Sequence, residues 1–256
     1  MRCPTLRLSM ALVLALHLLS GQAAWGAAQE LTVSAAASLA NAFSEIGHRF
    51  ENLHSETKVI FNFAASGALL QQISQGAPVD VFAAADQQTM NRAQEQRLIV
   101  PASRKNFVCN RLVLIAPHGR KLTLSGLGDL ELPLVKRVAL GNPATVPAGR
   151  YAQEGLIRAG LWETLQPKLI FGASVRQVLD YVSRGEVEAG FVFSTDAAIV
   201  PGKVKILAEI KMQQAIVYPV ALVAASPKQD LGQQFLNFLS SPEGMAIFEK
   251  YGFVRP

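Results

Sequence analysis

The feature that most constrains the fold is a repeated unit: an apolar strand, a short turn of small residues, and an amphipathic helix. The unit occurs in the first part of the chain and starts again in the middle. Strand and helix alternating at this spacing predict βαβ units and a largely parallel sheet in each part. Four of the turns carry small residues or Ser at the helix start, and they comprise residues 36–39, 65–67, 146–149 and 173–176.

The second run of units predicts a second α/β lobe. After the apolar stretch 216–225 only two helices follow, and two helices alone do not make a domain. We therefore predict that the chain returns to the first lobe and completes it. This division assigns residues 29–110 and 220–256 to lobe 1 and residues 111–219 to lobe 2. Two crossings, near residues 109–112 and 218–220, would form a hinge beside a cleft.

Residues 1–28 have the pattern of a secretory signal peptide. Arg2 and Arg7 precede an apolar stretch over residues 8–19. Small residues stand at positions −3 and −1 relative to a cleavage site before Gln29. The stretch is shorter than the roughly 20 residues that span a bilayer. We predict cleavage before Gln29 and export, and an uncleaved N-terminal anchor is the alternative.

Charge and cysteine content exclude two further classes. Removal of Arg2 and Arg7 lowers the formal charge from +5 to +3, and no cluster of Lys and Arg alternates with aromatic residues. Nucleic-acid binding is therefore not expected. Of the two cysteines, only Cys109 follows the signal segment, so the exported chain forms no internal disulfide. We expect Cys109 to be a small buried apolar residue.

The four turns together predict a binding site for a small anion. A helix N-terminus presents free N–H groups and a partial positive charge, and a Ser hydroxyl adds a donor. Turns that follow parallel strands lie together at the carboxyl edge of the sheet, where ligands bind. Each turn alone is also explained as a helix cap. Ser174 and Gln177 fit a capping box, which assigns the Ser174 hydroxyl to its own helix.

Motifs for catalysis are absent from these turns. Neither Ser38 nor Ser66 lies in a Gly-x-Ser-x-Gly motif. Asp80 and Asp86 flank a strand as a carboxylate pair, but strand-end aspartates more often cap the next helix. We therefore predict that the protein is not an enzyme and has no catalytic residues.

A series of short motifs matches one known family in order and spacing. They occupy residues 33–39, 63–69, 76–82 with 85–86, 140–143, 146–149, 174–176, 190–196, 218–220 and 248–253. Over nearly its whole length after residue 28, the chain resembles the periplasmic molybdate-binding proteins of bacterial ABC transporters. The resemblance implies a type II-like periplasmic binding protein fold, in which two α/β lobes joined by a two-strand hinge close over one ligand.

The same resemblance implies a function and its partners. The ligand is molybdate or tungstate, with molybdenum bound only as the oxyanion and with no cofactor. The protein is expected to be monomeric, to reside in the periplasm and to deliver the anion to a membrane ABC permease. The resemblance implies that Ser38 and Ser66 contact the anion through both the hydroxyl and the N–H group. It also implies backbone N–H contacts from Ala148 and Val175.

One position departs from the family pattern. Members often carry a Tyr whose hydroxyl donates to the oxyanion at the end of the strand over residues 189–193, and this chain has Phe193 there. Either the site makes one contact fewer, or Ser194, Thr195 or a water molecule supplies it.

Rival ligands and functions follow from the same residues. Sulfate is a dianion like molybdate but smaller, so only the size of the cavity would reject it. Phosphate usually carries a proton and needs an acceptor, and none of the four turns contains Asp or Glu. Ferric ion would need Tyr or His ligands. The other classes are an exported enzyme on this fold and a ligand-sensing partner of a membrane receptor.

Overall fold

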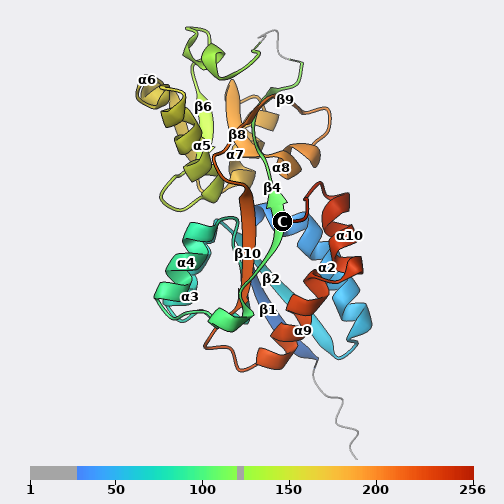
Figure 1. The fold of residues 1–256 in the computed structure, drawn as a ribbon. Helices are drawn as coiled ribbons and strands as arrows, with labels where there is room; N and C mark the ends of the chain where they lie inside the picture. Colours follow the sequence, from blue (N-terminus) through green and yellow to red (C-terminus); the bar gives the residue numbers. More distant parts are fainter. Residues whose placement is uncertain (1–27, 120–123) are drawn as a thin grey trace, which may run out of the picture.

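The computed structural model of the chain describes residues 28–119 and 124–256. The predicted signal segment up to residue 27 therefore lies outside the described residues. Within these two ranges, none of the helices has both the length and the apolar character needed to cross a bilayer. Two lobes stack end to end, and the chain passes between them twice (Figure 1).

A five-stranded mixed sheet forms the centre of the first lobe. Its first three strands run parallel, and one strand, β10, runs antiparallel to both of its neighbours. In spatial order the strands are β2 (Thr57–Ala64), β1 (Gln29–Ala36), β3 (Val81–Ala83), β10 (Ile216–Leu222) and β4 (Lys105–Asn110).

Helices cover both faces of this sheet (Figure 1). One face carries α3 (Ser66–Ser74) and α4 (Gln87–Glu95), and a short 3-10 turn, η2 (Pro101–Ser103), precedes β4. The other face carries α2 (Ala40–Leu53), which follows the 3-10 turn η1 (Ala37–Leu39), and the C-terminal helices α9 (Gln229–Leu239) and α10 (Pro242–Lys250). The ring of Phe43 on α2 lies within about 6 Å of four phenylalanine rings from β2, β4, α9 and α10, namely Phe61, Phe107, Phe235 and Phe248.

The second lobe has the same strand arrangement. Its sheet runs β7 (Leu169–Gly172), β6 (Val138–Gly141), β8 (Ala189–Phe193), β5 (Leu112–Pro117) and β9 (Val204–Ile210), and only β5 is antiparallel to its neighbours. The flanking elements are η3 (Leu127–Glu131), α5 (Pro147–Arg158), α6 (Trp162–Leu165), η4 (Gln166–Lys168), α7 (Val175–Ser183) and α8 (Ser194–Ala198). In each sheet, one strand runs opposite to the other four. It is the strand by which the chain enters that lobe from the other lobe.

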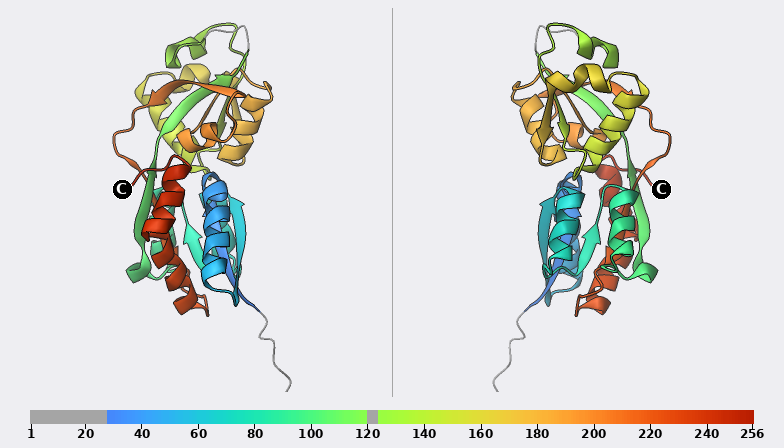
Figure 2. Two further views of the ribbon diagram at one scale, coloured as in Figure 1. Left: turned by 90° about the vertical axis from the view of Figure 1, so that its right-hand side faces the viewer. Right: turned by 90° about the vertical axis from the view of Figure 1, so that its left-hand side faces the viewer.

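The crossings define where the lobes meet. The first crossing is at Arg111, between β4 and β5, and the second comprises residues 211–215, between β9 and β10. The predicted boundary between residues 219 and 220 is wrong, because Val217 pairs with Cys109 and Ile216 with Asn110 in the first sheet. An uninterrupted apolar stretch does not indicate at which residue it joins a sheet. Both views in Figure 2 show the narrow junction that these crossings span.

Candidate anion-binding site

The four turns meet at a single pocket between the lobes. They follow β1 and β2 in the first sheet and β6 and β7 in the second, so the carboxyl ends of four strands face the junction. The space between them is small, about 200 Å³ including the part open to solvent. All five residues expected at the site line it, together with small or apolar neighbours: Ala36, Ala37, Ser38, Ala64, Ala65, Ser66, Ala85, Val146, Pro147, Ala148, Val175 and Phe193.

Helix starts supply the backbone donors of the pocket. Ser66 and Val175 are the first residues of α3 and α7, and Ala148 is the second residue of α5. N–H groups in a first helical turn have no acceptor within their own helix. Pro147, which has no N–H, occupies the first position of α5, where the loss of a donor costs least. The site therefore presents partial positive charge from both lobes.

The Ser174 hydroxyl is used by its own helix, as the sequence predicts. Its Oγ accepts a hydrogen bond from the Gln177 N–H at 3.2 Å, and the Gln177 Oε1 accepts one from the Ala173 N–H at 2.6 Å. Ser174 does not line the pocket. The capping prediction for this turn is confirmed, and the turn offers the pocket backbone groups only.

Each pocket serine is held by a partner behind it. The Ser66 Oγ accepts a hydrogen bond from the Ala85 N–H at 3.0 Å. The Ser38 Oγ lies 3.0 Å from the hydroxyl oxygen of Tyr218, which reaches it from β10. Both serines are buried, so their hydroxyl groups face either these partners or the pocket.

Phe193 closes one wall of the pocket with its ring. The ring packs edge-on against Tyr218 at 5.6 Å and against Tyr151 at 6.4 Å, measured between centroids. The hydroxyls expected to replace a missing donor here point elsewhere. Ser194 donates to the Asn110 Oδ1 at 3.1 Å, and Thr195 accepts from the Asn110 Nδ2 at 2.9 Å. Neither of them lines the pocket, so these two expected replacements are wrong.

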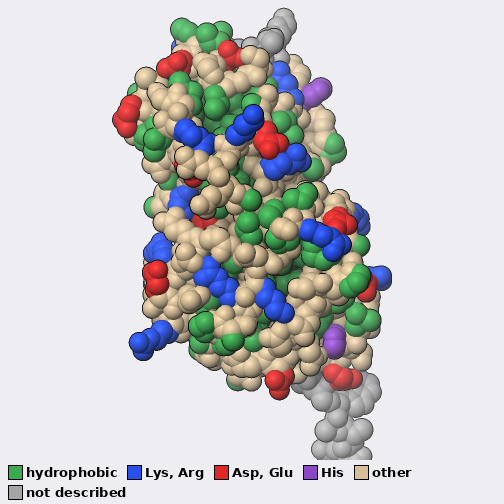
Figure 3. All heavy atoms as spheres, in the orientation of Figure 1, with side chains coloured by type: hydrophobic (Ala, Val, Ile, Leu, Met, Phe, Trp, Pro, Cys, Tyr) green, Lys and Arg blue, Asp and Glu red, His purple; other side chains and the backbone are tan. Residues whose placement is uncertain are grey.

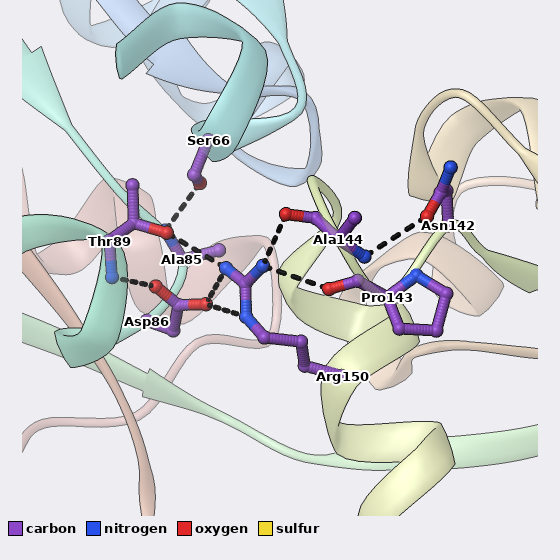
Figure 4. A network of polar contacts seen from close by, with 8 residues as sticks. All are labelled: Ser66, Ala85, Asp86, Thr89, Asn142, Pro143, Ala144 and Arg150. Atoms are coloured by element: carbon purple, nitrogen blue, oxygen red, sulfur yellow. Dashed lines mark hydrogen bonds and ion pairs between the residues drawn. The ribbon is translucent and has the colours of Figure 1, made fainter. Parts of the chain in front are cut away.

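A half-buried ion pair links the lobes beside the pocket. Arg150 on α5 donates from Nε to the Asp86 Oδ2 at 3.0 Å and from Nη2 to the Thr89 Oγ1 at 2.8 Å, and Nη2 also contacts Asp86. Nη1 of the same guanidinium donates to the carbonyl oxygens of Pro143 and Ala144 in its own lobe. Figure 4 shows this guanidinium between the two lobes, with Ser66 and Ala85 next to it.

A second arginine makes a similar link on the other side. Arg176 on α7 donates from Nε to the Asp196 Oδ1 at 2.5 Å in its own lobe. It also donates to the Asn41 Oδ1 at 2.8 Å and to the Ser38 carbonyl oxygen at 3.3 Å, both in the first lobe. Burial raises the pKa of Asp196, and the attraction of Arg176 opposes this shift. Both cations are thus engaged by protein groups, and none of the described residues that line the pocket is charged.

Both aspartates that flank β3 have structural roles, but the capping prediction is confirmed for Asp86 alone. Asp86 caps α4 by accepting from the Thr89 N–H at 2.7 Å. Asp80 accepts from the Thr32 N–H at 2.8 Å and from the Ser226 hydroxyl at 2.6 Å. Across the described ranges, no group of three or more His, Cys, Asp and Glu side chains is placed to hold a metal ion. On the face seen in Figure 3, Lys and Arg side chains are dispersed over both lobes.

Sequence reasoning did not assign the long-range side-chain contacts around the pocket, whether within one lobe or between the two. Arg150 and Asp86 are 64 residues apart, and Ser38 and Tyr218 are 180 residues apart. Arg176 lies in one of the four turns and Tyr218 in a matched motif, but neither position indicates which group it contacts. The signal available was the position of Arg150 directly after one turn and of Arg176 at the end of another.

Comparison with known proteins gives consistent matches. Residues 31–254 match the family of bacterial extracellular solute-binding proteins. The molybdate-binding protein ModA of Escherichia coli (strain K12) is 36% identical over 230 residues, which cover 88% of each chain.

Solved structures share the fold. The periplasmic molybdate-binding protein of Azotobacter vinelandii aligns with a TM-score of 0.77 at 24% identity, covering 88% of this chain and 99% of the other. The sulfate-binding protein SubI of Mycobacterium tuberculosis H37Rv aligns with a TM-score of 0.75 at 17% identity, covering 88% of this chain and 86% of the other. At these identities the likeness shows the two-lobe fold alone. Because the family match spans both lobes, the chain belongs to the bacterial extracellular solute-binding proteins, a family of binding proteins rather than of enzymes.

Proposed function

We propose that this protein binds molybdate, and also tungstate, in the pocket between its lobes and delivers the anion to a membrane ABC permease. The observation that carries the proposal is the convergence of four helix starts, two from each lobe, on a pocket that also holds two serine hydroxyls. The 36% identity to a molybdate-binding protein over most of both chains supports this choice of anion.

The chemistry of the lining suits a tetrahedral dianion. Contacts are proposed from the hydroxyl and N–H groups of Ser38 and Ser66 and from the N–H groups of Ala148 and Val175. These donors are held in place by their helices, so they replace the hydration shell of the anion with little reorganisation. Phe193 supplies an apolar wall and no donor.

Closure of the lobes over the ligand is the proposed binding step. The Gly67 N–H donates to the Thr145 carbonyl oxygen at 2.9 Å across the junction, and Arg150 and Arg176 also bond across it. These contacts support a closed form that surrounds the anion on all sides. Opening at the two crossings would release it to the permease at the outer face of the membrane, in the periplasm.

Sulfate is the second candidate, because it needs the same donors and is also a dianion. Phosphate is disfavoured, since the lining residues in the described part of the chain include no carboxylate to accept its proton. An exported enzyme on this fold would need a reactive group in the pocket. Among the residues that the structure describes, the side chains lining the pocket offer two hydroxyls and no base.

The first experiment is calorimetric titration of the protein from Gln29 onward, stripped of anions, with molybdate, tungstate, sulfate and phosphate. We expect tight one-to-one binding of the first two and no heat from the others. If sulfate binds with the same affinity as molybdate, the proposed ligand changes from molybdate to sulfate, the second candidate. Absence of binding to all four anions would refute an oxyanion site.

Delivery to a permease is tested separately in cells. Deletion of the gene should abolish growth on limiting molybdate under conditions that require a molybdenum enzyme, and excess molybdate should restore it. A strain that grows normally without the protein would favour the sensing role over uptake.

A further inference from the structure

The Asn110 side chain has an orientation fixed by a backbone donor. Asn110 is the last residue of β4, and its Oδ1 accepts from the Arg111 N–H at 2.8 Å. The Ser194 hydroxyl donates to the same oxygen. A backbone N–H can only donate, so the amide nitrogen of Asn110 must face the opposite side. There it donates to the hydroxyl oxygens of Tyr218 at 3.2 Å and Thr195 at 2.9 Å.

This orientation decides the direction of the next hydrogen bond. Tyr218 is fully buried, and its hydroxyl oxygen accepts from Asn110. Among the described residues, the acceptor within reach of its own proton is the Ser38 Oγ at 3.0 Å. A buried hydroxyl that keeps its proton unpaired loses its solvation without compensation. The Tyr218 hydroxyl therefore donates to Ser38.

We propose that Asn110 and Tyr218 are positioning residues that direct the Ser38 proton into the anion pocket. Because the Ser38 Oγ accepts from Tyr218, its own proton is left for the pocket that it lines. The chain of donors runs one way, from Asn110 through Tyr218 to Ser38 and then to the ligand. This inference rests on the proposed anion site, and it assigns roles to two residues outside the pocket lining.

Ser66 is oriented in the same way by a different donor. Its Oγ accepts from the Ala85 N–H, which leaves its proton for the pocket as well. Each pocket serine thus has its proton available for an oxygen of the anion.

The orienting residues lie where the chain passes between the lobes. Asn110 ends β4 just before the first crossing, and Tyr218 lies on β10 just after the second. Asn110 also bonds to Ser194 and Thr195 in the second lobe. Its orientation therefore depends on contacts that only the assembled junction provides.

A double-mutant cycle tests the role of Tyr218. We compare Tyr218→Phe, Ser38→Ala and the double variant in the whole chain from Gln29 by calorimetry with molybdate, and we check each fold by thermal unfolding. Tyr218→Phe should raise the Kd about 3- to 10-fold, the range expected for one hydrogen bond. In the Ser38→Ala background it should change the Kd less than about 2-fold, because the oriented proton is gone. An equal loss in both backgrounds would indicate packing alone and overturn the proposal.

Reversing the direction of the hydrogen bonds from Asn110 to Ser38 gives a sharper test. Asn110→Asp replaces the donor by a carboxylate, so Tyr218 donates to the new residue and Ser38 donates to Tyr218. At pH 8 this variant should bind molybdate more weakly than Tyr218→Phe does. Adding Tyr218→Phe to Asn110→Asp should then restore part of the affinity, because the Ser38 proton is released while the added charge stays. A packing role for Tyr218 predicts a further loss instead.

The outcomes separate the two proposals. If the unmodified protein does not bind molybdate, the proposed function fails. If it binds while Tyr218→Phe weakens binding in every background, only the positioning role fails. Should Tyr218→Phe not fold, Asn110→Asp with and without Ser38→Ala decides the matter. A loss that is smaller in the Ser38→Ala background supports the oriented proton, and an unchanged loss refutes it.

Discussion

The guanidinium of Arg150 on the second lobe bonds to the carboxylate of Asp86 on the first, with Nε 3.0 Å from Oδ2. The two side chains are only 17% and 4% exposed. Asp86 is at the same time the N-cap of α4. The pair thus joins the start of one helix to the first turn of another across the junction, next to two of the four pocket turns (Figure 4).

Loss of this pair should weaken ligand binding by weakening closure. Arg150→Gln leaves the buried Asp86 without its cation in the closed form, whereas water solvates it when the lobes separate. A charge-assisted bond contributes about 1.5–3 kcal/mol, so we expect a Kd for molybdate at least roughly tenfold higher, mainly through faster dissociation. Stopped-flow release measurements test this. Arg184→Gln removes the same charge from an exposed site of that lobe and should leave release unchanged.

Gly67→Ala should block closure by direct contact. A Cβ at this position would lie 2.7 Å from the Thr145 carbonyl oxygen and 2.9 Å from its Cα, both across the junction. The lobes should fold normally, while molybdate no longer reduces the radius of gyration in small-angle X-ray scattering. Gly128→Ala is the matched control, because its Cβ meets nothing within 4 Å. A normal compaction of the Gly67→Ala variant would contradict the observed tight approach.

Ser66→Ala should reduce affinity and also lower stability, because the buried Ala85 N–H loses its acceptor. It removes a donor to a charged ligand, which contributes about 1.5–3 kcal/mol, so the Kd should rise roughly 10- to 100-fold. Ser174→Ala should differ in its effect on affinity, since its hydroxyl caps α7 and does not line the pocket. That variant should lose about 1 kcal/mol of stability and keep most of its affinity. Calorimetry and urea unfolding of both variants distinguish the two roles.

Phe193→Tyr should strengthen molybdate binding. The ring already lines the pocket and packs against Tyr151 and Tyr218, so an added hydroxyl extends from a fixed position. A new donor to the anion should lower the Kd up to about tenfold, within the range of one charge-assisted bond. An unchanged or higher Kd would mean that the added hydroxyl does not reach the ligand.

Acid should remove the stabilising contribution of Glu45 on α2. Hydrogen bonds from Lys250 and then Tyr251, at the end of α10, lower the pKa of Glu45. A lowered folded-state pKa gives stability above the usual pKa, and this stability is lost as the pH falls through the folded-state value. The effect is small because Lys250 is largely exposed. In urea unfolding, the advantage of the unmodified protein over Glu45→Gln should therefore shrink from pH 7 to pH 3.

The local part of the site was predictable from the sequence. Ser38 and Ser66 stand at helix starts after apolar strands, and both the strand and the helix are encoded by side chains within about ten residues of the turn. The convergence of four such turns followed from the rule that parallel strands share a carboxyl edge. What stabilises the turns from behind was not predictable, because Tyr218 and Asp86 come from strands and loops far along the chain.

Pairing between distant strands limited the prediction of the fold in the same way. The apolar residues of β10 fit either sheet, and only their hydrogen bonds to β4 place Ile216 in the first one. Ser194 and Thr195 illustrate the same limit at the site. Their sequence position next to Phe193 is right for a ligand contact, but Asn110, from the other side of the first crossing, takes both hydroxyls.

The central place of β10 in the first sheet has a consequence for the order in which the molecule is assembled. Because β10 lies between β3 and β4, that sheet stays divided until residues 216–222 have been added. All five strands of the second lobe, from β5 to β9, are by then complete. A chain that folds as it emerges from its N-terminal end therefore finishes its second lobe first. The pocket is therefore incomplete until β10 is in place, because the hydroxyl of Ser38 pairs with that of Tyr218.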